Sequence, residues 1–436
     1  MIVPTRRAVL LLAAGFPLAL LPALLRPGLW PLWLAALATT AAAFTMEALL
    51  GGPSTPVAVQ ARGPAALYVG ADDVLHLELG GHWRQRTRVE VLCDFGETLE
   101  PQPAAHVWAG RAPARAATFL RPRRRGRAAV RAAWLRWPGP LGLLQWTERR
   151  PLDLSIPVLP NVRAVRGAAL RFFGSRQFLS GLKVQRHLGD GSEFESLREH
   201  RAGFDGRAID WKASARHHRM LSREYRAERN HAVVLAVDTG HLMAEPLLGI
   251  PKLDHAINAS LLLAYVALKT GDRVGLFAFD DGVRHYTEPQ GGVHSFGRLV
   301  GATSRLAYSA AETNFTLGLL DLGQRLRRRS LVVMLTDFVD TVTAELMVEN
   351  LGRLGRGHRV VFVALRDVAL DALAAQEPRD LDQLNRAVTA GDLAREREVV
   401  LSRLRRRGVL CVDGAPGAIS AGLVNRYLDL KRREMV

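Results

Sequence analysis

Five short apolar runs recur through the second half of the chain, and they constrain its fold more than any other feature. Each run has the length of a strand and is apolar throughout, without the alternation typical of a half-exposed strand. Amphipathic helical patterns lie between the runs. This order predicts a doubly wound α/β domain over residues 231–436, with a parallel sheet and helices on both faces. The runs are AVVLAVD (232–238), RVGLFAFD (273–280), SLVVMLTD (330–337), RVVFVAL (359–365) and VLCVD (409–413).

The first three of these predicted strands end in aspartate, at Asp238, Asp280 and Asp337. Ligands of such folds bind outside the carboxyl ends of the strands, so we expect a functional site there. No G-x-G-x-x-G motif follows the first run, and the chain contains no P-loop motif. The sequence therefore supports neither a dinucleotide site nor a P-loop nucleotide site.

The first fifty residues contain two stretches long enough to cross a bilayer. Residues 8–25 include 18 residues without a charge, and residues 27–46 include 20; a spanning helix needs about 20. They predict a transmembrane helical hairpin over residues 1–50. Arg6 and Arg7 precede the first stretch and an arginine-rich region follows the second, so the positive-inside rule places both ends in the cytoplasm. A cleaved export signal is the alternative, because TRRAVLL resembles a twin-arginine leader.

Residues 54–160 show a different pattern. The segments VLHLEL (74–79) and RVEVLC (88–93) alternate apolar and polar residues, and glycines and prolines interrupt them. This pattern predicts a small antiparallel β domain. Cys93 and Cys411 lie far apart inside apolar runs, which indicates buried thiols and neither a zinc site nor a disulfide framework.

The chain is strongly basic, with 59 Lys and Arg against 42 Asp and Glu, a formal net charge of +17. Nucleic acid, anionic lipid or an acidic protein could each complement such a charge. A basic nucleic-acid-binding protein is therefore kept as an alternative function, although it is less favoured than a protein-interaction module.

Several segments resemble known families. DTGHLM (238–243), ETNF (312–315) and TDF (336–338) resemble the loops of the von Willebrand factor A fold. The 40 residues from Gly191 to Asn230, GSEFESLREHRAGFDGRAIDWKASARHHRMLSREYRAERN, are similar to the signature of the domain of unknown function 58 family. PLGLLQWTERR (140–150) and the final segment, AISAGLVNRYLDLKRREMV, resemble that family too.

This resemblance implies a bacterial inner-membrane protein whose von Willebrand factor A-like domain faces the cytoplasm. It implies a non-enzymatic adaptor or assembly factor that works with a MoxR-type AAA+ ATPase and its client. The expected partners are thus the membrane and a protein, and no enzymatic activity is implied.

The resemblance also implies a metal-ion-dependent adhesion site, in which Asp238, Thr313 and Asp337 match the two aspartates and the threonine of the motif. Gly240 and Leu242 stand where the motif has serines. Mg²⁺ prefers oxygen ligands, and these two residues supply no side-chain oxygen. We therefore expect a degenerate site that binds Mg²⁺ weakly or not at all.

Residues 161–230 are expected to form a signature and linker segment rich in both signs of charge. Mixed charge of this density is typical of an ion-pair network that fixes a loop or binds a partner, with Ile209 and Trp211 as apolar anchors. A metal-dependent hydrolase that uses Asp205, Asp210 and Asp238 is the alternative, but no spacing matches a hydrolase or a zinc pattern. The candidate residues of this segment are Glu195, Arg198, Asp205, Asp210, Trp211, Lys212, Arg223 and Glu224.

Overall fold

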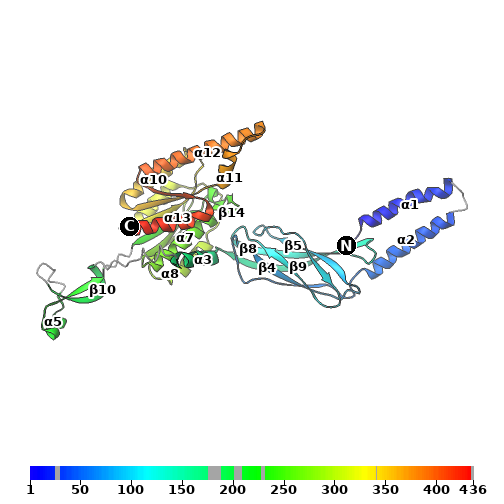
Figure 1. Ribbon diagram of the computed structural model, residues 1–436, viewed down its shortest axis with the longest axis horizontal. Coiled ribbons are helices and arrows are strands. Elements are labelled where there is room, and N and C mark those ends of the chain that lie inside the picture. The colour runs from blue at the N-terminus through cyan, green and yellow to red at the C-terminus, as the bar shows by residue number, and fades with distance from the viewer. Residues whose placement is uncertain (25–29, 175–187, 201–208, 227–230, 340, 434–436) are drawn as a thin grey trace. The chain divides into compact units, whose positions relative to one another are not determined.

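The computed structural model describes residues 1–436 except 25–29, 175–187, 201–208, 227–230, 340 and 434–436. The chain divides into two compact units, Met1–Asn161 and Val162–Val436. The first contains two amino-terminal helices and two β-sheets, and the second is built around a mixed sheet with helices (Figure 1).

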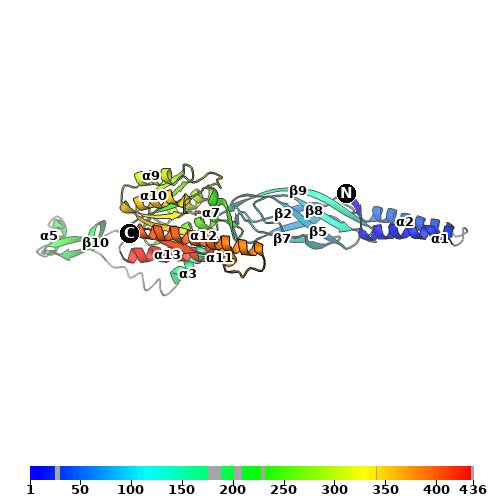
Figure 2. The same cartoon turned by 90° about the horizontal axis from the view of Figure 1, so that it is seen from above.

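Two helices begin the first unit, α1 (Arg6–Leu24) and α2 (Trp30–Leu50), and they lie side by side (Figure 1, Figure 2). Among the described residues, α2 is the one helix long and apolar enough to cross a membrane, and 6% of its most apolar window is buried. The second predicted span is therefore supported, with bounds shifted to Trp30–Leu50. The first predicted span coincides with α1, and its crossing of a membrane stays a prediction.

The carboxyl-terminal end of α2 is attached to the β-sheets of the same unit. Glu47 is 1% exposed, and both of its carboxylate oxygens lie 3.0 Å from the backbone N–H of Leu143. The indole Nε1 of Trp137 donates to the carbonyl of Gly51 at 3.1 Å. Gly139 passes so close that a Cβ there would lie 2.3 Å from Glu47 Oε1. The end of the helix is thus fixed by polar contacts from the turn between two long strands.

The two sheets of the first unit are almost wholly antiparallel, which confirms the predicted class; only the short β3 pairs in parallel, with β9. Leu75, Leu77 and Leu79 of β4 are buried while the residues between them are not, as the alternating pattern predicts. One sheet has the order β1-β9-β8-β5-β6, with β3 beside β9, and the other has the order β2-β4-β7. The strands are β1 (Ile2–Pro4), β2 (Ala58–Arg62), β3 (Leu67–Tyr68), β4 (Asp73–Gly80), β5 (Thr87–Phe95), β6 (Ala105–Ala109), β7 (Ala114–Leu120), β8 (Gly126–Pro138) and β9 (Leu144–Leu159).

The main sheet of the second unit has six strands in the order β16-β15-β12-β17-β18-β19. Five are the predicted apolar runs and lie parallel to one another, whereas β16 is antiparallel to β15. The sheet is therefore mixed and not purely parallel, because the polar segment VRHYTEPQ turns back along the edge of β15. The strands are β12 (Ala232–Asp238), β15 (Arg273–Phe279), β16 (Val283–Gln290), β17 (Leu331–Leu335), β18 (Arg359–Leu365) and β19 (Leu410–Gly414).

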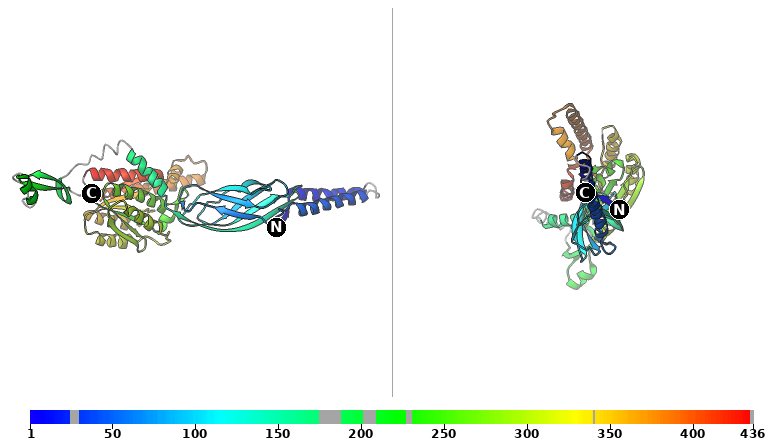
Figure 3. Two further views of the ribbon diagram at one scale, coloured as in Figure 1. Left: turned by 90° about the horizontal axis from the view of Figure 1, so that it is seen from below. Right: turned by 90° about the vertical axis from the view of Figure 1, so that its right-hand side faces the viewer.

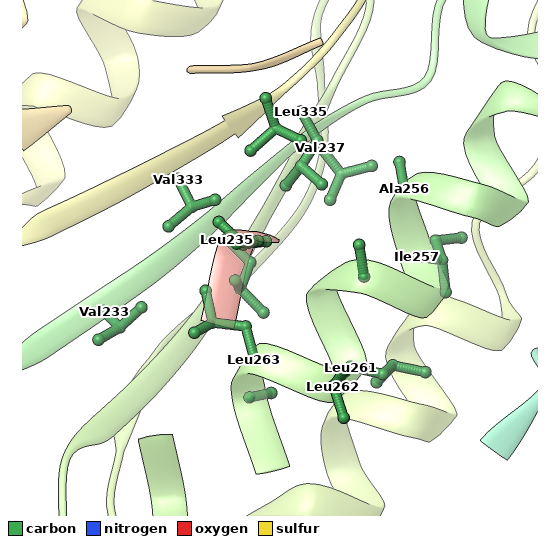
Figure 4. Packing of buried hydrophobic residues seen from close by; sticks show 14 of the residues in the cluster. Val233, Leu235, Val237, Ala256, Ile257, Leu261, Leu262, Leu263, Val333 and Leu335 are labelled. Carbon is green, nitrogen blue, oxygen red and sulfur yellow. The ribbon is translucent and has the colours of Figure 1, made fainter. Parts of the chain in front are cut away.

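Each face of this sheet has its own apolar core. Val233, Leu235 and Val237 of β12 face Ile257 and Leu261 of α7 in one core (Figure 4). That core also contains side chains of α3 (Val162–Gly174), α8 (Ser295–Ser304) and α13 (Pro416–Arg432), with α7 spanning Lys252–Lys269. The alternate strand residues pack in the other core with α9 (Phe315–Arg325), α10 (Thr343–Gly357) and α12 (Leu381–Arg406). The helix α13, in red, can be followed from below in Figure 3.

The remaining described elements of the second unit lie outside the main sheet. β10 and β11 pair in an antiparallel hairpin, and β13 and β14 form a two-stranded ribbon before α7. These elements are β10 (Leu188–Glu199), α5 (Trp211–His217), β11 (Leu221–Arg226), α6 (His241–Ala244), β13 (Pro246–Leu247), β14 (Ile250–Pro251) and α11 (Val368–Ala375).

Candidate functional site

Asp238 ends the central strand β12 and is 1% exposed. Its Oδ1 accepts hydrogen bonds from the Thr313 hydroxyl at 2.7 Å and from the Gly240 N–H at 2.8 Å, and its Oδ2 accepts one from the Thr336 hydroxyl at 2.5 Å. Burial raises the pKa of Asp238 above its ordinary value, while these three hydrogen bonds oppose that change. The structure thus brings together two of the three predicted metal residues, Asp238 and Thr313, through a direct hydrogen bond.

Asp337, the third predicted metal residue, follows the neighbouring strand β17, and its side chain is 8% exposed. Its Oδ2 lies 2.7 Å from the Nζ of Lys252, and its Oδ1 lies 3.4 Å from Nη1 of Arg397. Lys252 is the first residue of α7 and also pairs with Glu245 at 2.7 Å. The carboxylate of Asp337 therefore has two cationic partners from the protein itself.

Lys252 holds its charge although its side chain is only 14% exposed. Burial works against the charged form, but the carboxylates of Asp337 and Glu245 more than offset it, so the pKa of Lys252 is raised. A protonated ammonium therefore faces Asp337 at neutral pH.

Arg397, from α12, extends the network to the edge strand β19. Its Nη2 donates to the carbonyl of Leu365 and to Asp413 Oδ1, both at 3.0 Å, and its guanidinium lies over the ring of Phe338. Asp413 also pairs with Arg366 at 2.5 Å. Burial would raise the pKa of Asp413, but the two arginines lower it overall. The carboxyl ends of β12, β17, β18 and β19 are thereby joined by one set of polar contacts, called here the carboxyl-edge network: Asp238, Lys252, Thr313, Thr336, Asp337, Arg397 and Asp413.

Gly240 lacks the serine hydroxyl of the motif and also leaves space for the Thr313 side chain. A Cβ at this position would lie 2.1 Å from Thr313 Oγ1 and 3.1 Å from Asp238 Oδ1. Glycine is thus required for Thr313 to approach Asp238 as closely as it does. Leu242 lies in the short helix α6 and is half-buried, and the neighbouring His241 is exposed, with its N–H donating to the carbonyl of Ala311.

These donors do not fit a divalent cation. Mg²⁺ requires about six oxygen ligands in octahedral geometry. Asp337 instead faces an ammonium and a guanidinium, and their positive charges would repel Mg²⁺. In the described part of the chain, no group of three or more His, Cys, Asp or Glu side chains is arranged to hold a metal ion. Positive charge at these strand ends is supplied by Lys252 and Arg397.

The sequence analysis did not identify Lys252, Arg397 or Asp413. Lys252 follows Pro251 at the start of a helix, which is a signal of helix geometry and not of charge pairing. Arg397 lies in the charged run AREREVV, where nothing distinguishes it from its neighbours. Both residues are far from Asp337 along the chain, so only the folded sheet brings them to it.

The signature residues lie mainly in the β10–β11 hairpin and α5. Asp210 is the N-cap of α5, and its Oδ1 accepts from the N–H groups of Lys212 and Ala213, each at 3.0 Å. Trp211, expected to be an apolar anchor, is 70% exposed, because it occupies the first position of a helix that has no buried residue. That expectation was wrong for the tryptophan. Lys212 is exposed as well.

The other signature residues belong to strands or lie outside the described residues. Arg198 pairs in register with Ser222, Leu197 with Arg223 and Ser196 with Glu224. Glu195 lies at a shift of this register. Asp205 lies outside the described residues.

Both cysteines are free thiols. Burial raises the pKa of each, Cys93 and Cys411, to about 11, so neither is an activated nucleophile at neutral pH.

Comparison with known proteins gives one family match. The family described as "Protein of unknown function DUF58" matches residues 196–389. Among solved structures, a conserved hypothetical protein BatB from Bacteroides thetaiotaomicron is 13% identical, with 47% of this chain and 99% of that one covered and a TM-score of 0.30. An uncharacterized membrane spanning protein from Vibrio fischeri is 14% identical, with 46% and 97% covered and a TM-score of 0.17. No curated protein matches.

Proposed function

We propose that the chain is a membrane-anchored protein-interaction module without catalytic activity, which binds its partner at the carboxyl edge of the second unit's main sheet. The observation that carries this proposal is the carboxyl-edge network. It places buried, mutually paired charges where folds of this kind bind ligands, and it engages each central carboxylate with donors from the protein itself.

We further propose that the second unit is a von Willebrand factor A-like domain that works without metal. The strand order and the direct contact between Asp238 and Thr313 support this assignment. Lys252 stands in for the metal as the positive partner of Asp337. A permanent side-chain cation makes partner binding independent of Mg²⁺.

Exposed apolar side chains beside the network support a docking surface at this edge. Val339 and Val342 follow Asp337 and are 49% and 78% exposed, and Val368 follows β18 and is also exposed. Apolar residues gathered next to a polar centre are typical of protein interaction sites.

The anchored state follows from α2, with α1 as the second arm of a hairpin. In the proposed topology both units face the cytoplasm of a bacterial inner membrane, because basic residues flank the hairpin on that side. The resemblance to the domain of unknown function 58 family favours a MoxR-type AAA+ ATPase, with its client, as the partner.

Affinity purification of the tagged full-length protein from gently solubilised native membranes tests this function. We expect an AAA+ ATPase in the eluate, at equal yield in Mg²⁺ and in EDTA. Loss of the partner in EDTA would contradict the metal-independent site. Failure to recover any protein would contradict the interaction module.

A pair of variants localises the surface. Val342→Asp places a charge in the proposed contact and should reduce partner recovery roughly tenfold, since a charge buried against a partner without a counter-ion costs more than 1 kcal/mol. Val388→Asp, on α12, makes the same change at another exposed valine and should leave recovery unchanged.

A further inference from the structure

Arginines gather at the amino ends of three neighbouring strands in the second unit. Because β17, β18 and β19 are parallel and pair in this order, the residues that precede them lie along one edge of the sheet, opposite the carboxyl-edge network. This edge is called the amino edge. The exposed arginines that precede the three strands are Arg327, Arg328 and Arg329 before β17, Arg353 and Arg356 before β18, and Arg403, Arg405, Arg406 and Arg407 before β19.

Helix ends explain only part of this clustering. Cations are favoured in the last turn of a helix by the helix dipole, which accounts for Arg356 of α10 and for Arg403, Arg405 and Arg406 of α12. It does not account for Arg327 to Arg329, which lie beyond the end of α9 at Arg325. Several guanidinium groups along one edge repel one another, and an anion would relieve that repulsion.

Few carboxylates balance these arginines. Arg353 pairs with Glu349 at 2.7 Å and Arg405 pairs with Glu398 at 2.6 Å. Arg356 and Arg407 have no carboxylate partner in the described part of the chain, whereas Arg397, a half-buried arginine at the opposite edge, has two. The amino edge therefore presents guanidinium donors that are free to bind an external anion.

Three of the arginines of the amino edge, Arg353, Arg356 and Arg407, border a groove of about 580 Å³. Two glycines of α10 line it, and a glycine costs up to about 1 kcal/mol of helix stability relative to alanine. A Cβ at Gly352 would lie 2.9 Å from Arg407 Cδ, so this glycine lets the arginine lie across the helix. A Cβ at Gly355 would meet nothing within 4 Å, so the space above it is open. The groove is lined by Glu349, Gly352, Arg353, Gly355, Arg356 and Arg407.

We propose that this groove binds an acidic segment of a partner protein, with Arg356 and Arg407 pairing with its carboxylates. The inference rests on the proposed interaction function and gives the partner's chemistry. Guanidinium groups pair with carboxylates through two parallel hydrogen bonds, which gives such a contact direction as well as charge.

A peptide fits the groove better than a nucleic acid does. Glu349 places a hydrogen-bond acceptor among the arginines, and the N–H groups of a peptide backbone can donate to it, whereas the backbone of DNA has no donor. The groove residues include no aromatic side chain on which a base could stack.

The test uses the full-length protein in detergent and a short fluorescent peptide of alternating glutamate and glycine residues, with binding followed by fluorescence anisotropy. Arg356→Glu combined with Arg407→Glu should weaken peptide binding by roughly tenfold or more. Arg379→Glu combined with Arg386→Glu makes the same charge change at two exposed arginines of the same unit and should alter affinity by less than about twofold.

A second variant separates the groove from general electrostatics. Gly355→Leu leaves the net charge unchanged, suits a helix and fills the open space, so it should also weaken peptide binding. Thermal melting confirms that each variant is folded. Equal peptide affinity in the wild type, the Arg356 and Arg407 double variant and Gly355→Leu would overturn the proposal.

Single-stranded DNA and phosphatidylglycerol vesicles serve as the other anions. If either binds more tightly than the peptide and depends on Arg356 and Arg407, the groove serves a different ligand and the proposal fails. The partner experiment keeps the two proposals apart. If the double variant still recovers the AAA+ ATPase, the interaction function stands and the groove has no part in it. If the groove binds the peptide but no partner is recovered, the groove stands as an anion site and the interaction function fails.

Discussion

The two edges of the main sheet hold their charges differently. At the carboxyl edge, Asp337 is buried and Asp413 is half-buried, and each contacts two cations of the same chain. At the amino edge, Arg356 and Arg407 are exposed, and among the described residues they have no acidic partner. Charges of the first kind fix geometry, because removing one leaves its partner buried and unpaired. Charges of the second kind contribute little to folding and are available to an outside ligand.

Lys252→Met should give the largest effect at the carboxyl edge. The substitution keeps the length of the side chain but removes its charge, so Arg397, at the greater distance, is the cation that remains beside Asp337. We expect a loss of about 3 kcal/mol in the free energy of unfolding, measured by urea denaturation. Lys269→Met, at the exposed end of the same helix, should cost less than about 0.5 kcal/mol. Equal stability of the two variants would show that the Lys252–Asp337 pair does not stabilise the fold.

Gly240→Ser restores a serine of the adhesion motif and should still be harmful. The new Cβ would meet Thr313 Oγ1 at 2.1 Å and displace its hydrogen bond to Asp238, at a cost of about 2 kcal/mol. We also expect Mg²⁺ to leave the melting temperature of this variant unchanged. Gly297→Ser, where a Cβ has open space, is the control. Stabilisation of Gly240→Ser by Mg²⁺ would mean that glycine alone prevents metal binding.

Acid should distinguish the two edges as well. The pKa of Asp413 is lowered by its arginines, so its stabilising contribution is fully present above the unfolded value of about 3.9 and is lost as pH falls through the lower folded value. Asp413→Asn should therefore lose less stability than the wild type between pH 5 and pH 3, the difference being at most about 1 kcal/mol. Arg356→Gln should leave that pH dependence unchanged, because an arginine stays charged throughout. Identical pH profiles for Asp413→Asn and the wild type would argue against this carboxylate as a contributor.

Gly355→Ala should have the smallest effect, and of opposite sign. The added methyl group meets nothing within 4 Å and favours the helix, so the variant should be more stable by about 0.5 to 1 kcal/mol in thermal or chemical unfolding. Gly352→Ala should gain less, since Arg407 would have to move. A loss of stability in Gly355→Ala would show that the space above this glycine is not open.

The sequence predicted those parts of the fold that depend on local patterns. The five apolar runs became the five parallel strands, because a strand covered on both faces excludes polar residues along its whole length. The antiparallel β16 was not predicted, because its polar residues suit an exposed edge and resemble a loop.

The candidate site was predictable only in part. Asp238 and Thr313 were found through a motif, and the structure joins them. The cations that face Asp337 come from residues 85 positions before it and 60 positions after it, and no local pattern connects such distant charges. Burial of Trp211 was predicted from its apolar character, but its helix buries none of its residues.

The contact between Glu47 and Leu143 has a consequence for biosynthesis. These residues are 96 positions apart, so a ribosome working at 5 to 20 residues per second makes the second of them roughly 5 to 20 seconds after the first. In an anchored chain, α2 would enter the bilayer during that interval, while the Glu47 carboxylate near the end of the helix would still be in water. A carboxylate is costly in hydrocarbon, so it holds this end of the helix at the bilayer surface until the turn after β8 is complete. In an anchored chain, translation would thus set the order of events: insertion would come first, and the attachment of helix to sheet would follow.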